Sequence, residues 1–148
     1  MIYIGADHGG YKLKEHLKKF FKSKKLEFSD LGAKTLKAGD DYPDYAKQVA
    51  KKVSQNPMRN VGILICRSGQ GVCIVANKFE HVRAALVWNT KEAEMSRTDD
   101  MANVLCLPSD YISQKDAEKI VDVWLNTSFS SEARHVRRVK KISALEGK

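Results

Sequence analysis

The chain alternates between short apolar runs and longer segments in which apolar residues recur every three or four positions. Residues 2–7 form the first apolar run and predict a buried strand. Gly9 and Gly10 then turn the chain into a segment whose apolar residues have helical spacing, at Leu13, Leu17, Phe20 and Phe21. The opening of the chain therefore predicts a strand, a tight turn and an amphipathic helix.

The same alternation continues along the sequence. Residues 61–66 are a continuous apolar run bounded by a glycine-rich turn, which is typical of a central parallel strand. Residues 34–41 predict a polar loop. Further strands are expected at 27–31, 83–88 and 104–107, and helices at 44–53, 71–79, 91–101, 114–125 and 131–143.

Strands that alternate with helices in this way predict an α/β fold, with right-handed crossovers and a parallel sheet covered by helices on both faces. The 148 residues, 43% of them hydrophobic, are enough for one domain spanning residues 1–148. Ligands of such sheets bind beyond the carboxyl ends of the strands. We therefore expect Asp7, His8, residues 66–71 and the segment after Trp88 to share one crevice.

Charge and hydropathy narrow the class of partner. The formal net charge of +8 fits either a nucleic-acid surface or lysine-rich solvated faces around a site for a small phosphate. The lysines of residues 12–25 mostly lie opposite the apolar positions of the first helix, and no nucleic-acid motif is present, which favours the second interpretation. With no signal-like segment or membrane-length apolar run, we expect a cytoplasmic protein without a nucleic-acid or membrane partner.

The cysteines point to chemistry other than crosslinking. Cys66, Cys73 and Cys106 are odd in number and include no C-x-x-C pair, which argues against a disulfide framework and a zinc site. Cys66 ends the central strand, where backbone N–H groups of the following loop can converge on an anion. A thiolate there can abstract a proton next to a carbonyl while those groups stabilise an enediolate. By position alone, a buried structural cysteine explains Cys66 equally well.

Better-known loop motifs do not fit residues 66–71. No Gly-Lys-Ser/Thr follows the glycines, so the loop is not a P-loop. Val72 stands where a cysteine phosphatase loop needs arginine, and the first strand is followed only by Gly9 and Gly10 rather than by a dinucleotide fingerprint. A thiolate beside converging N–H groups remains.

Two further groups of side chains are candidates for substrate contacts. Asp7 and His8 supply a carboxylate and an imidazole at the end of the first strand, although a helix N-cap with an exposed neighbour explains them as well. Arg134 and Arg138 stand one helical turn apart, so both guanidinium groups can reach one phosphate. A solvated basic helix end is the alternative.

Together these segments resemble the type B ribose-5-phosphate isomerase family, which includes the subunits of galactose-6-phosphate isomerase. The resemblance runs nearly from end to end. It is carried by Gly5–Gly10 with Leu13-Lys14, Asp41–Ala46, Gly62–Cys66 with Gly69 and Gly71, Ala76–Phe79, Arg83-Ala84, Ser96-Arg97, Ala102–Leu105, and Arg134-His135 with Arg138.

The resemblance implies a Rossmann-like three-layer α/β/α sandwich with a five-stranded parallel sheet. It also implies a homodimer or dimer of dimers with active sites at the interface, which interconverts ribose 5-phosphate and ribulose 5-phosphate without a metal or other cofactor. By resemblance, Cys66 is the base that moves the proton between C2 and C1. Ser68 is the loop hydroxyl. The resemblance also implies that the enediolate is held by the backbone of Arg67, Gly69, Gln70 and Gly71. The sugar would be contacted by Asp7, His8 and Tyr42, and the phosphate by Arg134 and Arg138.

Three positions depart from the family pattern. In the family, a His-Asn pair opens the sugar ring and binds the sugar; this chain has Asp99-Asp100 instead. We therefore expect Asp99 to relay the proton in ring opening and Asp100 to contact the substrate. Arg67 replaces glycine, and Asp110 replaces an arginine that assists phosphate binding. We expect Arg67 to take over part of that role, with Asp99 or Asp100 as its partner. The alternative function is a phosphosugar-binding protein with altered specificity or little catalysis.

Overall fold

The computed structural model describes residues 1–147 and contains a five-stranded, entirely parallel sheet in the order β2-β1-β3-β5-β4. This confirms the predicted α/β fold. The strands are β1 (Ile2–Ala6), β2 (Phe28–Asp30), β3 (Val61–Cys66), β4 (Ala84–Leu86) and β5 (Val104–Pro108). The helices are α1 (Tyr11–Ser23), α2 (Tyr42–Gln55), α3 (Gln70–Ala76), α4 (Thr90–Thr98), α5 (Gln114–Asn126) and α6 (Ala133–Ser143).

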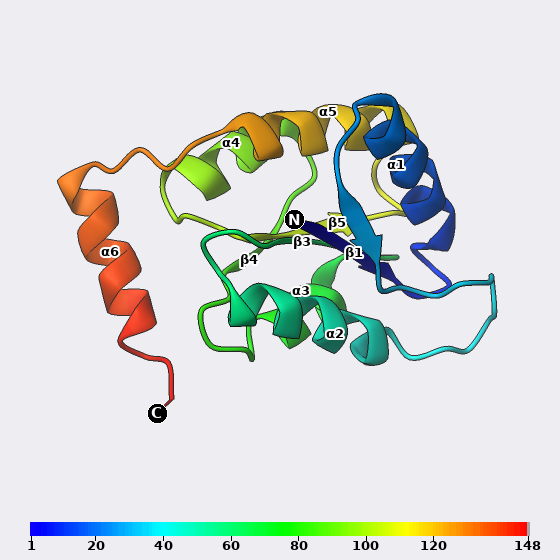
Figure 1. Cartoon of the computed structure of the whole chain (residues 1–148), viewed down its shortest axis with the longest axis horizontal. Helices are drawn as coiled ribbons and strands as arrows, with labels where there is room; N and C mark the ends of the chain where they lie inside the picture. Colours follow the sequence, from blue (N-terminus) through cyan, green and yellow to red (C-terminus); the bar gives the residue numbers. More distant parts are fainter. Residues whose placement is uncertain (148) are drawn as a thin grey trace.

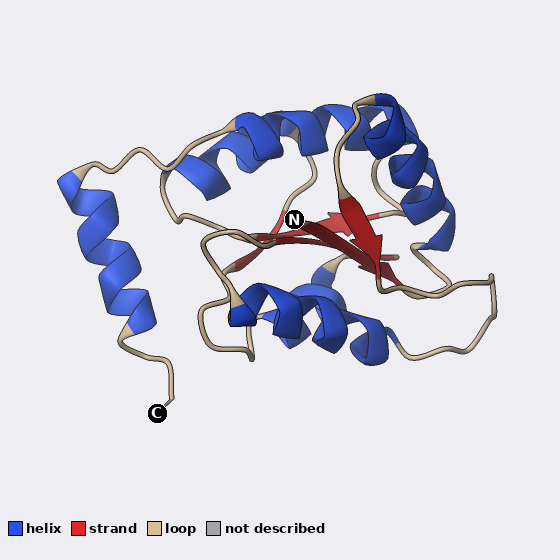
Figure 2. Ribbon diagram, viewed as in Figure 1, coloured by secondary structure: helices blue, strands red, loops and turns tan. Residues whose placement is uncertain are grey.

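Helices cover both faces of the sheet, as the three-layer prediction requires. Helices α1, α4 and α5 lie on one face, and α2 and α3 lie on the other (Figures 1 and 2). Neighbouring residues of β3 alternate between the two cores: Ile63 and Ile65 pack with α1 and α5, whereas Leu64 and Cys66 pack with α2 and α3. A strand buried on both faces explains the continuous apolar run at residues 61–66.

Strand register brings three loops together at the carboxyl edge of the sheet. Ala6 of β1 pairs with Ile65 of β3, and Cys66 pairs with Pro108 of β5. The loops that follow β1, β3 and β5 therefore start side by side. This is the edge at which the sequence predicted a crevice.

The predicted elements are all present, but β2, β4, α3, α4 and α6 are shorter than expected. Asn77, directly after α3, donates from Nδ2 to the carbonyl of Ala84 at 2.9 Å and accepts from the Ala84 N–H at 2.8 Å. The Asn77 amide therefore hydrogen-bonds both backbone groups of the first residue of the edge strand β4. The side chain explains why the helix ends at Ala76 rather than at the predicted residue 79.

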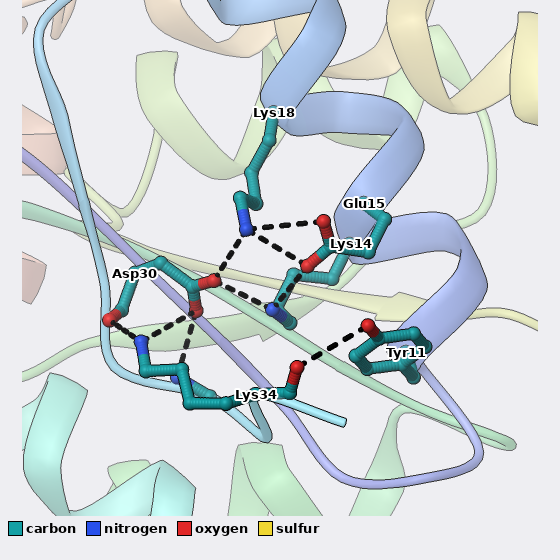
Figure 3. A network of polar contacts seen from close by, with 7 residues as sticks. Tyr11, Lys14, Glu15, Lys18, Asp30 and Lys34 are labelled. Atoms are coloured by element: carbon teal, nitrogen blue, oxygen red, sulfur yellow. Dashed lines mark hydrogen bonds and ion pairs between the residues drawn. The ribbon is translucent and has the colours of Figure 1, made fainter. Parts of the chain in front are cut away.

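One lysine contradicts the prediction of a solvated basic face on α1. Lys14 is fully buried, with Nζ 2.6 Å from Asp30 Oδ2 and 2.7 Å from Glu15 Oε1 (Figure 3). Lys18 also reaches Asp30 Oδ2, at 2.8 Å, and Gly32 donates its N–H to Asp30 Oδ1. Burial alone would raise the pKa of Asp30, but these hydrogen bonds and positive charges lower it. The cluster fastens α1 to the end of β2.

Helix α6 lies at the opposite, amino edge of the sheet. Its approach is anchored by Ser130, whose N–H donates to the Thr98 carbonyl, and by His135, whose Nδ1 lies 2.7 Å from Ser130 Oγ. After the helix, Glu146 pairs with His81 at 2.9 Å. Between residues 77–85 and 142–147 lies a cavity of about 660 Å³. No helix within residues 1–147 has the length and apolarity needed to cross a bilayer.

Candidate active site

Cys66 occupies the carboxyl end of β3 and is only 6% exposed. The Gly69 N–H donates to Cys66 Sγ at 3.2 Å, so the loop folds back over the sulfur. Gly69 has φ +71°, and a Cβ there would lie 2.5 Å from Leu86 Cδ1 and 3.1 Å from the Leu107 carbonyl carbon. The left-handed φ favours glycine, and the backbone contact at 3.1 Å leaves little room for a Cβ.

Ser109 and Asp110 join the loops around Cys66. Ser109 Oγ lies 3.0 Å from the Gly9 carbonyl oxygen and 3.2 Å from that of Cys66, so its proton can be donated to either. The Asp110 N–H donates to the Arg67 carbonyl at 3.0 Å. The family resemblance singled out Asp110 only as a departure from its pattern and gave Ser109 no role. The structure gives them a part in fixing the loop conformation.

Asp7 and His8 lie at this edge, as predicted. Asp7 is 6% exposed, and its Oδ1 accepts from the Gly10 N–H at 3.0 Å, so this carboxylate caps the turn before α1. His8 is paired with Asp40, a residue that sequence analysis placed in a polar loop without a role. The two are 32 residues apart, and no periodicity or motif in the sequence connects them.

Tyr42, the first residue of α2, lies against the start of α3. A Cβ on Gly71 would come within 2.5 Å of Tyr42 Cζ and 2.9 Å of its hydroxyl oxygen. Tyr42 remains 38% exposed, so its ring is in contact with both the Cys66 loop and solvent. Gln70, which begins α3, donates its N–H to Ser68 Oγ at 3.4 Å. The Cys66 loop and the predicted sugar-site residues Asp7, His8 and Tyr42 therefore share one edge of the sheet.

Arg67 has a different partner from the one expected. Its Nη1 lies 3.8 Å from Asp110 Oδ2, and its side chain passes over Gly9, where a Cβ would lie 2.6 Å from Arg67 Cγ. The expectation that Asp99 or Asp100 pairs with Arg67 is therefore wrong for a single chain. The Arg67 side chain is 72% exposed, which leaves its guanidinium accessible at the rim of the site.

The remaining predicted residues lie at the other end of the sheet. Asp99 and Asp100 follow α4 and precede β5, and Arg134 and Arg138 belong to α6. Strands rise about 3.3 Å per residue, so β3 alone separates the two edges by about 16 Å. Asp99 accepts from Thr98 Oγ1 at 2.7 Å, and Arg134 Nε donates to Glu132 at 2.9 Å. One chain therefore does not bring these four residues to Cys66.

The other two cysteines, Cys73 and Cys106, are packed within the fold and lie away from the candidate site. Cys73 donates from Sγ to the Ala84 carbonyl at 3.4 Å. Cys106 on β5 is fully buried, and burial, with a contribution from Cys73, raises the pKa of its thiol well above the usual value. Neither thiol lies in the loops at the carboxyl edge.

Asp7, His8 and Asp40 are the group within residues 1–147 whose ligand atoms are close enough to hold a metal, all within 4.8 Å of one another. In this structure, Asp7 Oδ1 is bound by Gly10 and Asp40 Oδ1 by His8. A metal would compete with these hydrogen bonds. The arrangement is that of a hydrogen-bonded carboxylate and imidazole pair at a turn.

Comparison with known proteins places the chain in a family. The family model described as Ribose/Galactose Isomerase matches residues 2–142. A probable ribose-5-phosphate isomerase B of Mycoplasma genitalium is 45% identical over 98% of this chain and 95% of its own length. The ribose-5-phosphate isomerase B of Escherichia coli is 37% identical over 98% of this chain and 95% of its length.

Solved structures agree with the sequence comparison. The crystal structure of ribose-5-phosphate isomerase B from Mycoplasma genitalium with bound ribulose-5-phosphate has a TM-score of 0.95 at 44% identity, covering 99% of this chain and 96% of that one. The corresponding protein of Clostridium thermocellum has a TM-score of 0.92 at 40% identity, with coverages of 98% and 96%. The chain therefore belongs to the ribose/galactose isomerase family.

Proposed function

We propose that this protein interconverts ribose 5-phosphate and ribulose 5-phosphate through an enediolate, with Cys66 as the base and without a metal. The observation that carries the proposal is the Cys66 thiol at the carboxyl end of β3, capped by the Gly69 N–H at 3.2 Å. Ribose-5-phosphate isomerase B proteins that are similar over nearly the whole chain support this substrate.

The reaction needs one base that serves two adjacent carbons. With the sugar open, the Cys66 thiolate takes the proton from C2, and the C1 carbonyl electrons move onto O1, which gives the enediolate. O1 gains a proton and O2 loses one, and Cys66 returns its proton to C1. Atoms and charge balance without an external reductant or oxidant. Ser68, two residues from Cys66, is the hydroxyl that we assign to proton exchange between O1 and O2.

Negative charge on the enediolate must be stabilised where it develops. We assign this role to the backbone from Arg67 to Gly71, with Gln70 at the start of α3. Asp7, His8 and Tyr42 would hold the sugar hydroxyls from the β1 and α2 sides. The proposed site thus combines a base, N–H donors and hydroxyl-binding groups on one edge of the sheet.

The phosphate and ring-opening groups would come from a second copy of this chain. Arg134, Arg138, Asp99 and Asp100 lie at the amino edge and cannot reach the Cys66 of their own chain. A homodimer that places this edge beside the carboxyl edge of its partner would complete two equivalent sites. At this edge, Ile142 near the end of α6 and Leu145 after the helix are exposed, at 41% and 69%. A dimer of dimers could repeat the same arrangement.

Conversion of ribose 5-phosphate by the purified protein, with a chelator present, tests the proposal. We expect turnover that survives the chelator and falls on the order of 100-fold or more in Cys66→Ala. Cys73→Ala is the matched control, because Cys73 lies outside the carboxyl-edge loops, and it should retain activity. If Cys66→Ala and Cys73→Ala behaved alike, Cys66 would not be the base.

A folded protein without turnover would favour the second candidate, a phosphosugar-binding protein. The observation behind this candidate is the presence of Asp99-Asp100 and Arg67 in place of the family residues. Calorimetric titration with ribose 5-phosphate would then show binding without conversion. A short phosphosugar that cannot cyclise would separate a ring-opening defect from loss of proton transfer. A protein that lacks only ring opening would convert this open-chain substrate, whereas a protein that lacks proton transfer would not.

A further inference from the structure

The loop between β2 and α2 ends in a carboxylate that is directed at the site. Asp40 Oδ1 accepts two hydrogen bonds from His8, from the backbone N–H at 2.9 Å and from ring Nδ1 at 2.5 Å. The Asp40 side chain is only 10% exposed, whereas His8 keeps 32% exposure. The pair is thus held by the protein on the Asp40 side and open to solvent on the His8 side.

The ionisation of Asp40 determines which nitrogen of His8 carries a proton. Burial would raise the pKa of Asp40, but hydrogen bonds from the His8 backbone and ring, together with the Tyr45 hydroxyl, outweigh it and hold the pKa below its ordinary value. An ionised carboxylate can only accept hydrogen bonds, so Nδ1 of His8 must be protonated. Nε2 is then the nitrogen left for a ligand.

His8 is the histidine that lies among the loops around Cys66. His16 on α1 pairs with Glu118 of α5 at 2.7 Å. His81 and His135 are held at the amino edge by Glu146 and Ser130. An imidazole with a fixed Nδ1–H is a defined hydrogen-bonding group for a sugar phosphate: Nε2 accepts from a hydroxyl when neutral and donates to an anionic oxygen when protonated.

We propose that Asp40 is a positioning residue for substrate binding, which holds His8 in the Nδ1–H form and presents Nε2 to the sugar phosphate. This inference rests on the proposed isomerase function. Asp40 also fastens the end of loop 31–41 to the turn after β1, while the Asp30 cluster fastens its beginning. The loop is therefore anchored at both ends, and the His8 ring cannot rotate without losing the Asp40 bond.

The test compares two variants of Asp40. Asp40→Ala removes the acceptor, so His8 should shift toward the Nε2–H form that a free histidine side chain prefers. Asp40→Asn retains a neutral acceptor oxygen and should preserve much of the Nδ1–H form. The direct measurement is a long-range proton–nitrogen NMR correlation of the histidine rings, which assigns the protonated nitrogen and requires no substrate.

Activity is measured on the same proteins. We expect kcat/KM for ribose 5-phosphate to fall on the order of 10- to 100-fold in Asp40→Ala, mainly through KM, with partial recovery in Asp40→Asn. Glu118→Ala is the matched control, because it removes the carboxylate partner of His16, away from the site, and should leave kcat/KM unchanged. Its NMR spectrum should change at His16 alone.

The outcomes separate this inference from the proposed function. If the unaltered protein fails to isomerise ribose 5-phosphate, the proposed function is wrong, while the NMR comparison still tests whether Asp40 sets the form of His8. If His8 keeps Nδ1 protonated in Asp40→Ala, or if kcat/KM falls without any change at His8, Asp40 is not a positioning residue. If Asp40→Ala does not fold, the test rests on Asp40→Asn. Activity and His8 signals in Asp40→Asn equal to those in Glu118→Ala would support a role for Asp40 as the hydrogen-bond acceptor of His8. Full loss of the Nδ1–H form in Asp40→Asn would overturn that role.

Discussion

Arg67 and Asp110 face each other across the rim of the candidate site, with Nη1 and Oδ2 3.8 Å apart and the backbone N–H of Asp110 bonded to the Arg67 carbonyl. By resemblance, the family has glycine at the first position and arginine at the second. The resemblance therefore implies a guanidinium on the other of the same two loops. The Arg67 side chain is 72% exposed, so the ion pair is weak and the arginine remains available to a ligand.

Loss of Arg67 should therefore weaken substrate binding rather than folding. We expect Arg67→Gly to raise KM for ribose 5-phosphate about tenfold, equivalent to the loss of one charge-assisted hydrogen bond of about 1.4 kcal/mol. The free energy of unfolding should change by less than about 0.5 kcal/mol. The double variant Arg67→Gly/Asp110→Arg should recover binding, because it restores a guanidinium at the other loop. Binding by Arg67→Gly as tight as that of the unaltered protein would sink the idea.

Much of the fold could be predicted because its determinants are local in the sequence. The run at residues 61–66 and the helical spacing of Leu13, Leu17 and Phe21 reflect burial of one strand on both faces and of one helix on one face. The carboxyl-edge position of Cys66 followed from the parallel sheet. The end of α3 could not be predicted, because it depends on an amide contact between Asn77 and the edge strand β4.

The candidate site was only partly predictable for a similar reason. His8 was identified by its place after the first strand, but Asp40 reaches it from a loop 32 residues away. Lys14 stands among the polar positions of the first helix, which predicts a solvated side chain. In the structure it is buried because its Nζ pairs with Asp30. Long-range pairing of polar side chains leaves no periodic trace in the sequence, so neither contact could be inferred from it.

The conformation of Gly69 leads to a prediction about the Cys66 loop. Gly69→Ala should destabilise the protein by about 2 kcal/mol or more, because the left-handed conformation and the backbone of Leu107, 3.1 Å from the Cβ position, both oppose a Cβ. Activity should also fall, because relief of this strain would displace the residue 69 N–H from Cys66 Sγ. Gly39 is the matched control: it has φ +83° with nothing within 4 Å of its Cβ position. Gly39→Ala should cost only about 1 kcal/mol and keep activity. Equal losses of stability, measured by urea unfolding, would argue against the packing role of Gly69.

Asp30 leads to a prediction about acid stability. Its pKa is lowered in the folded protein, so the stabilisation is fully present above its unfolded value of about 3.9 and is lost as the pH falls through the folded pKa. Asp30→Asn should destabilise the protein by about 3 kcal/mol at pH 7, because it leaves the buried Lys14 without its nearest carboxylate. The difference between variant and unaltered protein should shrink as the pH falls below about 4.

Urea unfolding between pH 7 and pH 2.5 measures this dependence. Glu94→Gln is a suitable control, since Glu94 forms an exposed pair with Lys91 at 3.1 Å. It should change the free energy of unfolding by less than about 0.5 kcal/mol at pH 7. If Asp30→Asn were as harmless as Glu94→Gln, the cluster in Figure 3 would contribute little to stability.

The separation of the candidate residues between two sheet edges leads to a complementation test. Cys66→Ala removes the proposed base at one edge, and Arg134→Ala/Arg138→Ala removes the proposed phosphate ligands at the other. Each variant should be inactive alone. In a symmetric dimer with shared sites, a mixed dimer places both defects in one site and leaves the second intact, so an exchanged equal mixture should recover about a quarter of the original activity. A monomeric enzyme, or sites built within one chain, would show no recovery. Mixing Cys66→Ala with Cys66→Ser controls for exchange itself, because both carry the defect at the same edge and no combination of them contains an intact site.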